Sequence, residues 1–441
     1  MKSKFISKKE AAPLRASTEL ILPNVVLTCL TTDKFKTGCL SVNLLTPLDR
    51  ETASLNALIP AVLCRGTATL PDMAAISAKL DSLYGARIRP IVRKKGEVQA
   101  IGLYADFADE AFLPAGTNIL EEMVALVSEM LLLPRTHGGL FLREYVESER
   151  EKLLEQIRGR INEKRSYSVR RLYELMCSME DYATDKLGSE TAAESITPHE
   201  LTRHYQQLLA DAPVEIFYCG SVEPARVKAA FLTALAALPR SDEEPDIGTD
   251  IRMNALEAEP RYFEEELQVT QGKLAIGFRL GECMLEPDTA AIKVFNALYG
   301  GSVTSKLFMN VREKLSLCYF ASSWADLHKG ILTVSSGIEF DKYDAALAEI
   351  FAQLEAVKNG EFTVEELEAA KRSVAGDYRI VSDSASALEN FYLDQALIGP
   401  DCAPDELAAL AGEVTAEDVS AIARGIECDA IYFLRGRKED E

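Results

Sequence analysis

A repeat along the chain constrains the fold more than any other feature of the sequence. Residues 196–201 (ITPHEL) and 414–419 (VTAEDV) carry the same helix-start pattern 218 positions apart, and each predicts a helix followed by a strand. The long charged helical runs that contain Glu147 and Glu365 fall at the same offset. Because two independent features agree on one offset, the pattern indicates a duplicated unit.

Strands and helices alternate in each copy in a way that favours antiparallel pairing. Residues 19–48 are rich in Val, Leu and Thr around a polar turn, and residues 94–97 (KKGE) predict a second hairpin. Hairpins outnumber βαβ crossovers, so we expect an α+β fold with two homologous halves. Each half would be a mostly antiparallel sheet packed with helices.

The boundary between the halves is predicted from a change in composition. Residues 239–260 are acidic and interrupted by prolines, which is typical of a linker. We therefore predict an N-terminal domain at 1–238, an acidic linker at 239–260 and a C-terminal domain at 261–441.

Charge and cysteine content exclude several classes of function. The 48 Lys and Arg residues face 69 Asp and Glu, a net charge of −21, which argues against nucleic acid or an anionic membrane as a partner. The nine cysteines include no CxxC pair, so we expect reduced thiols and a cytoplasmic protein. The first fifteen residues are basic without an apolar core, which does not fit a secretory signal.

Residues 299–319 (YGGSVTSKLFMNVREKLSLCY) form the most distinctive stretch. A Gly-Gly turn and a Ser-Val-Thr-Ser run predict the capped start of a helix. Leu307, Phe308, Val311 and Leu315 would then form one apolar face, followed by a strand from Cys318. Without further information, this is a surface helix docked on a sheet, with its arginine in a solvated salt bridge.

This stretch resembles the C-terminal-half motif of the pitrilysin/insulinase (M16) zinc peptidases. Gly-Gly, Ser, Leu-Phe, Arg-Glu and Tyr recur in that family at this spacing, and a weaker likeness covers most of the chain. The resemblance implies that both halves have the M16 fold. It also implies that Arg312 and Tyr319 contact the backbone of a bound peptide.

In the same family, a first-half helix carries His-x-x-Glu-His, which supplies two zinc ligands and the base. Residues 57–67 (ALIPAVLCRGT) resemble that helix through the Leu-x-Arg-Gly-Thr tail. The first ligand position is then Ala57, the base position Pro60 and the second ligand position Ala61. None of these side chains can bind zinc or move a proton.

The third ligand of the family is a Glu on a later helix. Residues 149–150 (Glu-Arg) match the start of its pattern, which places Gln156 on the ligand position, with Glu155 one residue away. A single carboxylate could not hold a catalytic zinc alone. The resemblance therefore implies that this chain binds no metal.

No other catalytic set is visible in the sequence. The four histidines are His137, His199, His204 and His328, and no HxH, HxxxH or HxxEH occurs. His199 and His204 are five residues apart and would face different sides of a helix. There is no GxSxG elbow and no phosphate-binding glycine loop.

These patterns lead to one main hypothesis and two alternatives. The chain would be a catalytically silent M16 subunit with no cofactor of its own, whose partner subunit carries the intact motif and the zinc. Arg312 would bind a peptide carbonyl and Tyr319 would stabilise the oxyanion. The partner would be another M16 chain or a second copy of this one. The alternatives are a structural or peptide-binding scaffold, in which both residues can be relics of descent, and an autonomous metallopeptidase with an unrecognised metal site.

Overall fold

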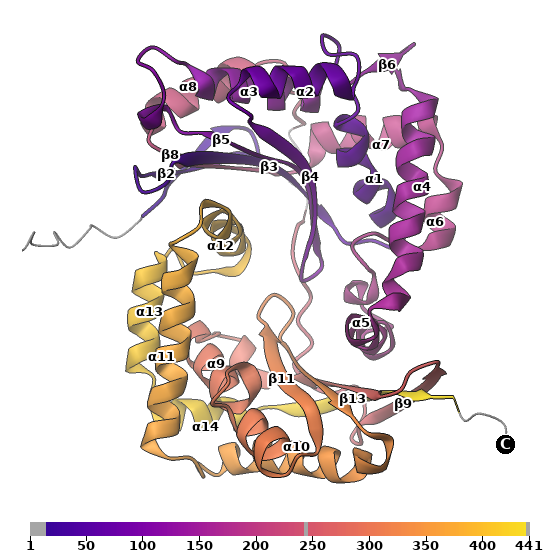
Figure 1. Cartoon of the computed structure of the whole chain (residues 1–441), viewed down its shortest axis with the longest axis vertical. Helices are drawn as coiled ribbons and strands as arrows, with labels where there is room; N and C mark the ends of the chain where they lie inside the picture. The colour runs from indigo at the N-terminus through magenta and orange to yellow at the C-terminus, as the bar shows by residue number, and fades with distance from the viewer. Residues whose placement is uncertain (1–14, 242–245, 438–441) are drawn as a thin grey trace, which may run out of the picture.

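Two β-sheets, each with its own helices, organise the molecule in the computed structural model, which describes residues 15–241 and 246–437. Figure 1 shows the first sheet above the second. In spatial order, the first contains β1 (Ser17–Leu22), β2 (Val25–Thr31), β8 (Val214–Gly220), β3 (Thr37–Pro47), β5 (Val98–Ala108) and β4 (Arg87–Lys95). The second contains β11 (Cys318–Asp326), β12 (Ile331–Ile338), β10 (Gly272–Arg279), β13 (Glu427–Gly436) and β9 (Arg261–Leu267).

The two sheets repeat one topology. Read from the opposite edge, the order β9-β13-β10-β12-β11 matches β2-β8-β3-β5-β4, and the matched strands follow each other in the same chain order. One pair in each sheet is parallel, β2 with β8 and β9 with β13, and the other pairs are antiparallel. The predicted α+β fold with two homologous, mostly antiparallel halves is confirmed.

Matching helix starts explain why the repeat is visible in the sequence. Thr197 caps α7 (Pro198–Asp211) by accepting from the amide of Glu200, with Pro198 in the first turn. Thr415 caps α14 (Ala416–Arg424) in a capping box with Asp418. The same local hydrogen bonds therefore begin the helix before the parallel strand in both copies.

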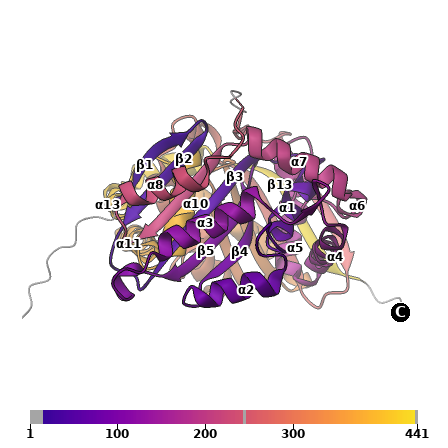
Figure 2. The same cartoon turned by 90° about the horizontal axis from the view of Figure 1, so that it is seen from above.

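Each sheet has an outer face covered by helices of its own half. On the first sheet these are α1 (Ala53–Leu63), α3 (Ile119–Leu132), α7 and α8 (Pro224–Ala234), which lie over the strands in Figure 2. On the second they are α9 (Thr289–Asn296), α10 (Tyr343–Lys358) and α14. The remaining α-helices of eight or more residues in the described ranges are α2 (Met73–Ser82), α4 (Arg143–Gly159), α5 (Lys164–Met176), α11 (Val364–Val381), α12 (Ala385–Ile398) and α13 (Pro404–Glu413), and α6 (Glu190–Ser195) is shorter.

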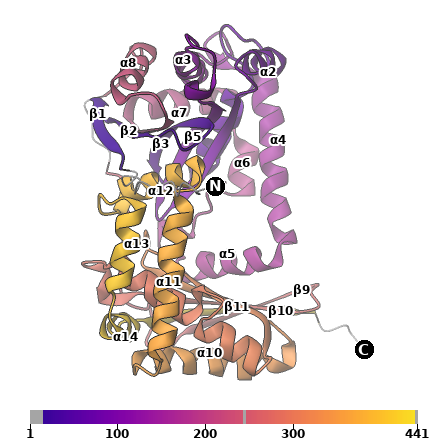
Figure 3. The same cartoon turned by 60° about the vertical axis from the view of Figure 1, so that its left-hand side comes forward.

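The inner faces are covered by helices exchanged between the halves. Helix α5 of the first half buries Leu172 and Met176 against β10, β12 and β13 of the second sheet. Helix α12 of the second half buries Leu388 and Leu393 against the first sheet. In Figures 1 and 3 both helices lie between the sheets. Each half therefore completes the core of the other.

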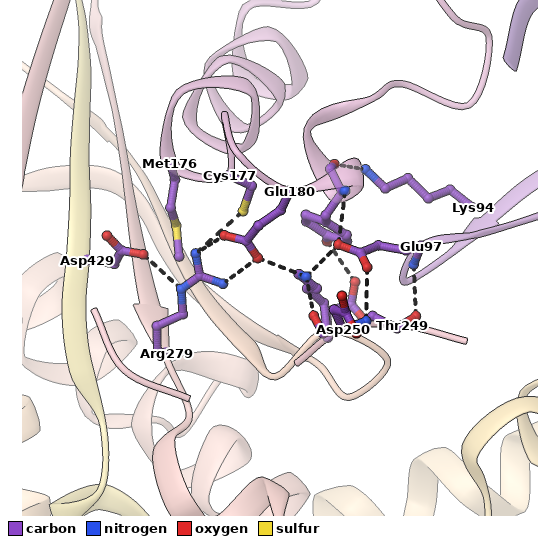
Figure 4. A network of polar contacts seen from close by, with 12 residues as sticks. Lys94, Glu97, Met176, Cys177, Glu180, Thr249, Asp250, Arg279 and Asp429 are labelled. Carbon is purple, nitrogen blue, oxygen red and sulfur yellow. Dashed lines mark hydrogen bonds and ion pairs between the residues drawn. The ribbon is translucent and has the colours of Figure 1, made fainter. Parts of the chain in front are cut away.

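Buried charges also join the halves (Figure 4). Glu180, in the loop after α5, accepts from Arg279 on β10 at 2.6 Å and lies 2.8 Å from Lys329 in the β11–β12 turn. Lys329 also pairs with Glu97 of the first-half hairpin, whose second oxygen accepts from the amide of Asp250 at 2.9 Å. Part of the predicted linker is thus held in this network.

The structure differs from the predictions in one broken helix and in three elements that were not predicted. The charged run predicted over 142–177 is two helices, because it breaks between Gly159 and Lys164. The described part of the predicted linker, at 239–241 and 246–260, contains no helix or strand, and its residues 242–245 lie outside the described residues. Strand β9 and helices α12 and α13 were not predicted.

No helix in the described ranges is long and apolar enough to cross a membrane.

Candidate functional site

The three positions matched to metal ligands lie together in the first half. Ala57 and Ala61 on α1 and Gln156 on α4 line one pocket of about 340 Å³. Ala57 and Ala61 are four residues apart and so share a helix face. Ala61 and Gln156 are 95 positions apart in the sequence and line the same pocket. At the three matched positions, the side chains are two methyl groups and one amide.

Pro60, which the resemblance matches to the family's base, lies inside α1 and is buried. A proline there has no amide to donate to the carbonyl of Asn56, so one helical hydrogen bond is lost. Pro60 lies beyond the first turn of α1, and only within that turn would a missing amide cost no helical hydrogen bond. It provides no proton-transfer group.

The carboxylate in the wall of this pocket is neutralised by two cations. Glu149 is buried and accepts from Arg65 at 2.8 Å and from Lys152 at 2.7 Å. Gln156 and its neighbour Glu155 are exposed. The one buried carboxylate is therefore already held by two cations, and the pocket does not fit a zinc ion. Within residues 15–241 and 246–437, no group of three or more His, Cys, Asp or Glu could hold a metal.

A buried amide network lies beneath α1. Asn56 donates to Gln99 at 2.8 Å, and its oxygen lies 2.6 Å from Nε2 of His204. Burial lowers the pKa of His204 below its ordinary value, which favours the neutral ring. His199 is exposed on the same helix, so these two histidines do not form a metal pair.

Arg312 and Tyr319 lie together in the second half. They line a pocket of about 370 Å³ with Glu339 and Lys342. The Tyr319 hydroxyl donates to Glu339 at 3.1 Å, and this hydrogen bond raises the pKa of Tyr319 above its ordinary value. The Arg312 guanidinium lies 3.3 Å from Glu313 and over the Phe308 ring, 4.7 Å from its centroid. Both side chains remain open to solvent, with exposed fractions of 41% for the arginine side chain and 61% for the tyrosine.

The helix that carries Arg312 is wider than predicted. Residues Leu307–Lys314 form a π-helical segment, and Leu315 donates to the carbonyl of Asn310 five residues back. Leu307 and Val311 are buried as predicted, but Leu315 lies beyond the helix and is 45% exposed. Ser316 then adopts a φ of 51°, which turns the chain into β11. This turn brings Tyr319 into the pocket of Arg312.

The structure has two homologous halves, in which Ala57, Ala61 and Gln156 stand at the positions matched to zinc ligands and Arg312 and Tyr319 share a second pocket. Residues 195–374 match the family described as "Peptidase M16 inactive domain". The chain is 33% identical over 406 residues to "Probable inactive metalloprotease YmfF" of Bacillus subtilis, covering 92% of this chain and 94% of that protein. It belongs to the M16 peptidase family as a non-catalytic member, as predicted.

Solved structures share the fold of this chain. A conserved protein from Enterococcus faecalis superposes with a TM-score of 0.86 at 28% identity, covering 97% of this chain and 100% of that chain. A peptidase M16 inactive domain from Pseudomonas fluorescens superposes at 0.75 with 18% identity, covering 97% and 98%, which shows the shared fold.

Proposed function

We propose that this chain is the silent subunit of a two-chain M16 peptidase. It binds peptide and completes the active site of a partner subunit that carries the intact His-x-x-Glu-His motif. The observation that carries the proposal is that Arg312 and Tyr319 share an open pocket, whereas Ala57 and Ala61, matched to the two histidine ligands, have no atom that can bind zinc. Zinc would come with the partner only.

The chemistry of the Arg312 pocket suits a peptide backbone. Among the described residues, the ion-pair partner of Arg312 is its neighbour Glu313, at a long 3.3 Å, so most of its five N–H donors are available for carbonyl oxygens. Tyr319 lies on β11, an edge strand, and edge strands offer unpaired backbone groups to an added chain. Arg312 would hold a substrate carbonyl, and the Tyr319 hydroxyl would donate to the oxyanion as it forms.

The cysteines support a reducing compartment, and we infer the cytoplasm. All nine cysteines lie in the described ranges and none forms a disulfide. Burial raises the pKa of several thiols, including Cys29 and Cys64, to about 12, so they are poor thiolates at neutral pH.

The test is reconstitution with an M16 chain that carries the intact motif, such as one encoded beside this gene. Peptide hydrolysis should require both chains. Arg312→Ala and Tyr319→Phe should each lower kcat/KM by about 10²-fold, the usual cost of one lost oxyanion donor. Lys314→Ala is the matched control, because Lys314 is exposed next to the pocket but does not line it.

Two results would contradict the proposal. Hydrolysis by the mixed chains that is unchanged in Arg312→Ala would leave the arginine without its role. A stable complex that never hydrolyses peptide would instead favour the scaffold alternative.

A further inference from the structure

A hollow of about 440 Å³ lies between the two halves, outside the two pockets described above. Its walls come from separate segments: Lys94 near the end of β4, Arg165 and Tyr173 on α5, Lys186 in a loop, and Trp324 on β11. Strands β4 and β11 are the matching edge strands of the two sheets. The hollow therefore lies where both sheets present an edge.

Cations outnumber carboxylates in the wall of the hollow, with four cationic and two acidic side chains. Asp185 pairs with Arg160 at 2.7 Å and Asp326 accepts from the Tyr182 hydroxyl at 2.7 Å, and both carboxylates also act on Lys94 from a longer distance. Within the described ranges, Lys94, Arg165 and Lys186 have no ion-pair partner. The wall of the hollow is therefore basic in a chain whose net charge is −21.

The cation of Lys94 is also partly withdrawn from water. Its ammonium donates to the backbone carbonyls of Tyr182 and Thr184 and lies 3.8 Å from the centroid of the Tyr182 ring. Burial lowers the pKa of Lys94 to about 8. Burial destabilises the charged form of Lys94, and a bound anion next to the ammonium would stabilise that form again.

Aromatic side chains also line the hollow. The indole of Trp324 donates to the Tyr173 hydroxyl at 3.2 Å, and that hydroxyl lies 2.8 Å from Thr333. These bonds fix the two rings in place. Flat, fixed rings next to cations suit a ligand that has both carboxylates and apolar groups.

The hollow continues in both directions. It shares Lys186 with the pocket of Ala57 and Ala61, and it shares Lys94 and Trp324 with a further hollow of about 440 Å³ beside α12. A row of adjoining hollows along two sheet edges fits an extended chain better than a compact small molecule.

We propose that this hollow binds acidic side chains of an extended peptide, so that the protein selects anionic peptides. The proposal rests on the proposed function, because it takes a peptide as the ligand, and it adds the class of peptide. Lys94, Arg165 and Lys186 would bind the carboxylates, and Trp324 would pack against the neighbouring side chain.

The experiment uses Trp324, the one tryptophan of the chain, as the reporter. The full-length protein is titrated with a Glu-rich peptide of about ten residues, which extends to about 33 Å. The comparison ligands are the same peptide with Gln for every Glu, and free glutarate. We expect the acidic peptide to change the Trp324 emission and to bind at least about tenfold more tightly than the amide peptide and glutarate, with weaker binding at high salt.

The variants are chosen so that folding is not in question. Lys94 holds the loop at Tyr182 and Thr184, so the test uses Arg165→Gln and Lys186→Gln, whose side chains are exposed. Each should weaken acidic-peptide binding by about tenfold. Lys36→Gln removes the same charge from an exposed turn between β2 and β3 and should change nothing.

Each outcome decides between possibilities. Equal binding of the acidic and amide peptides, or no effect of Arg165→Gln and Lys186→Gln, overturns the charge selection. If glutarate binds as tightly as the acidic peptide, the ligand is a small dicarboxylate and the proposal of a peptide ligand is wrong. Charge selection with no effect of Arg312→Ala in the two-chain assay would leave this site intact and overturn the proposed function instead.

Discussion

The guanidinium of Arg279 donates to the carboxylate of Asp429 at 2.8 Å, and neither side chain has any exposed surface. Glu180 binds the other side of the same guanidinium and also Lys329, which is likewise fully buried. Burial acts to raise the pKa of Glu180, but its bonds to Arg279 and Lys329 hold that pKa below the ordinary value. Since Glu180 belongs to the first half and both cations to the second, these bonds fix how the halves meet.

Replacement of Glu180 with Ala should destabilise the protein by about 3–5 kcal/mol, because it leaves two buried cations with one partner fewer each. The measurement is the free energy of unfolding from urea denaturation. Glu147→Ala serves as the control, since Glu147 forms an exposed pair with Arg143 and its loss should not change stability measurably. An unchanged urea midpoint for Glu180→Ala would show that the network does not hold the halves together.

The exchange of α5 and α12 predicts that the halves do not fold separately. A fragment that ends before the predicted linker keeps α5 but loses the sheet that buries Leu172 and Met176. The complementary fragment exposes Leu388 and Leu393 of α12. We expect each fragment alone to aggregate or to unfold without cooperativity, as judged by size-exclusion chromatography and circular dichroism, and co-expression to restore one complex.

The outcome decides whether residues 1–238 and residues 261–441 can each fold independently. If the first fragment alone unfolds cooperatively at the urea concentration of the whole chain, the exchanged helices contribute little to stability. The control is the full-length chain with a protease site inserted between residues 242 and 245. After cleavage at that site, the two pieces should stay associated.

Much of the fold could be predicted because its signals are local. The caps at Thr197 and Thr415 and the apolar strands around them act within a few residues of chain. The position of α12 depends instead on a distant partner. Its buried Glu389 is neutralised by Arg93 of the first sheet, 2.7 Å away, and a lone glutamate in a helix predicts a solvated face. Strand β9 contains three successive glutamates and forms only beside β13.

The candidate site was predictable only where a family pattern reaches it. The spacing of the Arg-Glu and Tyr motif pointed to Arg312 and Tyr319, and the Arg-Gly-Thr tail fixed the positions of Ala57 and Ala61. Lys94, Arg165 and Trp324 come from three segments with no common motif, and their proximity exists only once α5 has crossed to the second sheet. None of the three was predicted from the sequence.

The raised pKa of Glu215 predicts how the free energy of unfolding depends on pH. It lies on β8 without an ion-pair partner among the described residues, and burial raises its pKa to about 7. An unfolded glutamate titrates near pH 4.3, so between about pH 4.3 and 7 the unfolded state releases its proton first and stability falls as pH rises. Glu215→Gln should therefore be about 1–3 kcal/mol more stable than the wild type at pH 8 and equally stable at pH 4.

Urea denaturation at both pH values checks this prediction. Glu151→Gln is the control, because Glu151 is exposed on α4 and should show no such pH-dependent gain. A gain for Glu215→Gln that is the same at pH 4 and pH 8 would mean that the effect comes from packing and not from the carboxylate charge.

The pocket of Ala57, Ala61 and Gln156 predicts that a zinc site can be restored. Two histidines four residues apart on α1 and a glutamate on α4 are a ligand set that zinc accepts. The variant Ala57→His/Ala61→His/Gln156→Glu should bind about one zinc per chain, measured by competition with a chromogenic chelator, whereas the wild type should bind none at this pocket. Lys152 lies in the same pocket, so its replacement by Gln should tighten zinc binding further.

The decisive control is the variant with the two histidines alone. Position 156 lines the pocket and Glu155 does not, so the double variant should bind zinc at least about tenfold more weakly than the triple variant. If the two bind equally, the third ligand comes from Glu155 or from another group, and the alignment of α4 with the family is shifted. Two histidines and a glutamate are sufficient to bind zinc when they lie close together. If neither variant binds zinc, α1 and α4 are therefore not as close as the shared pocket requires.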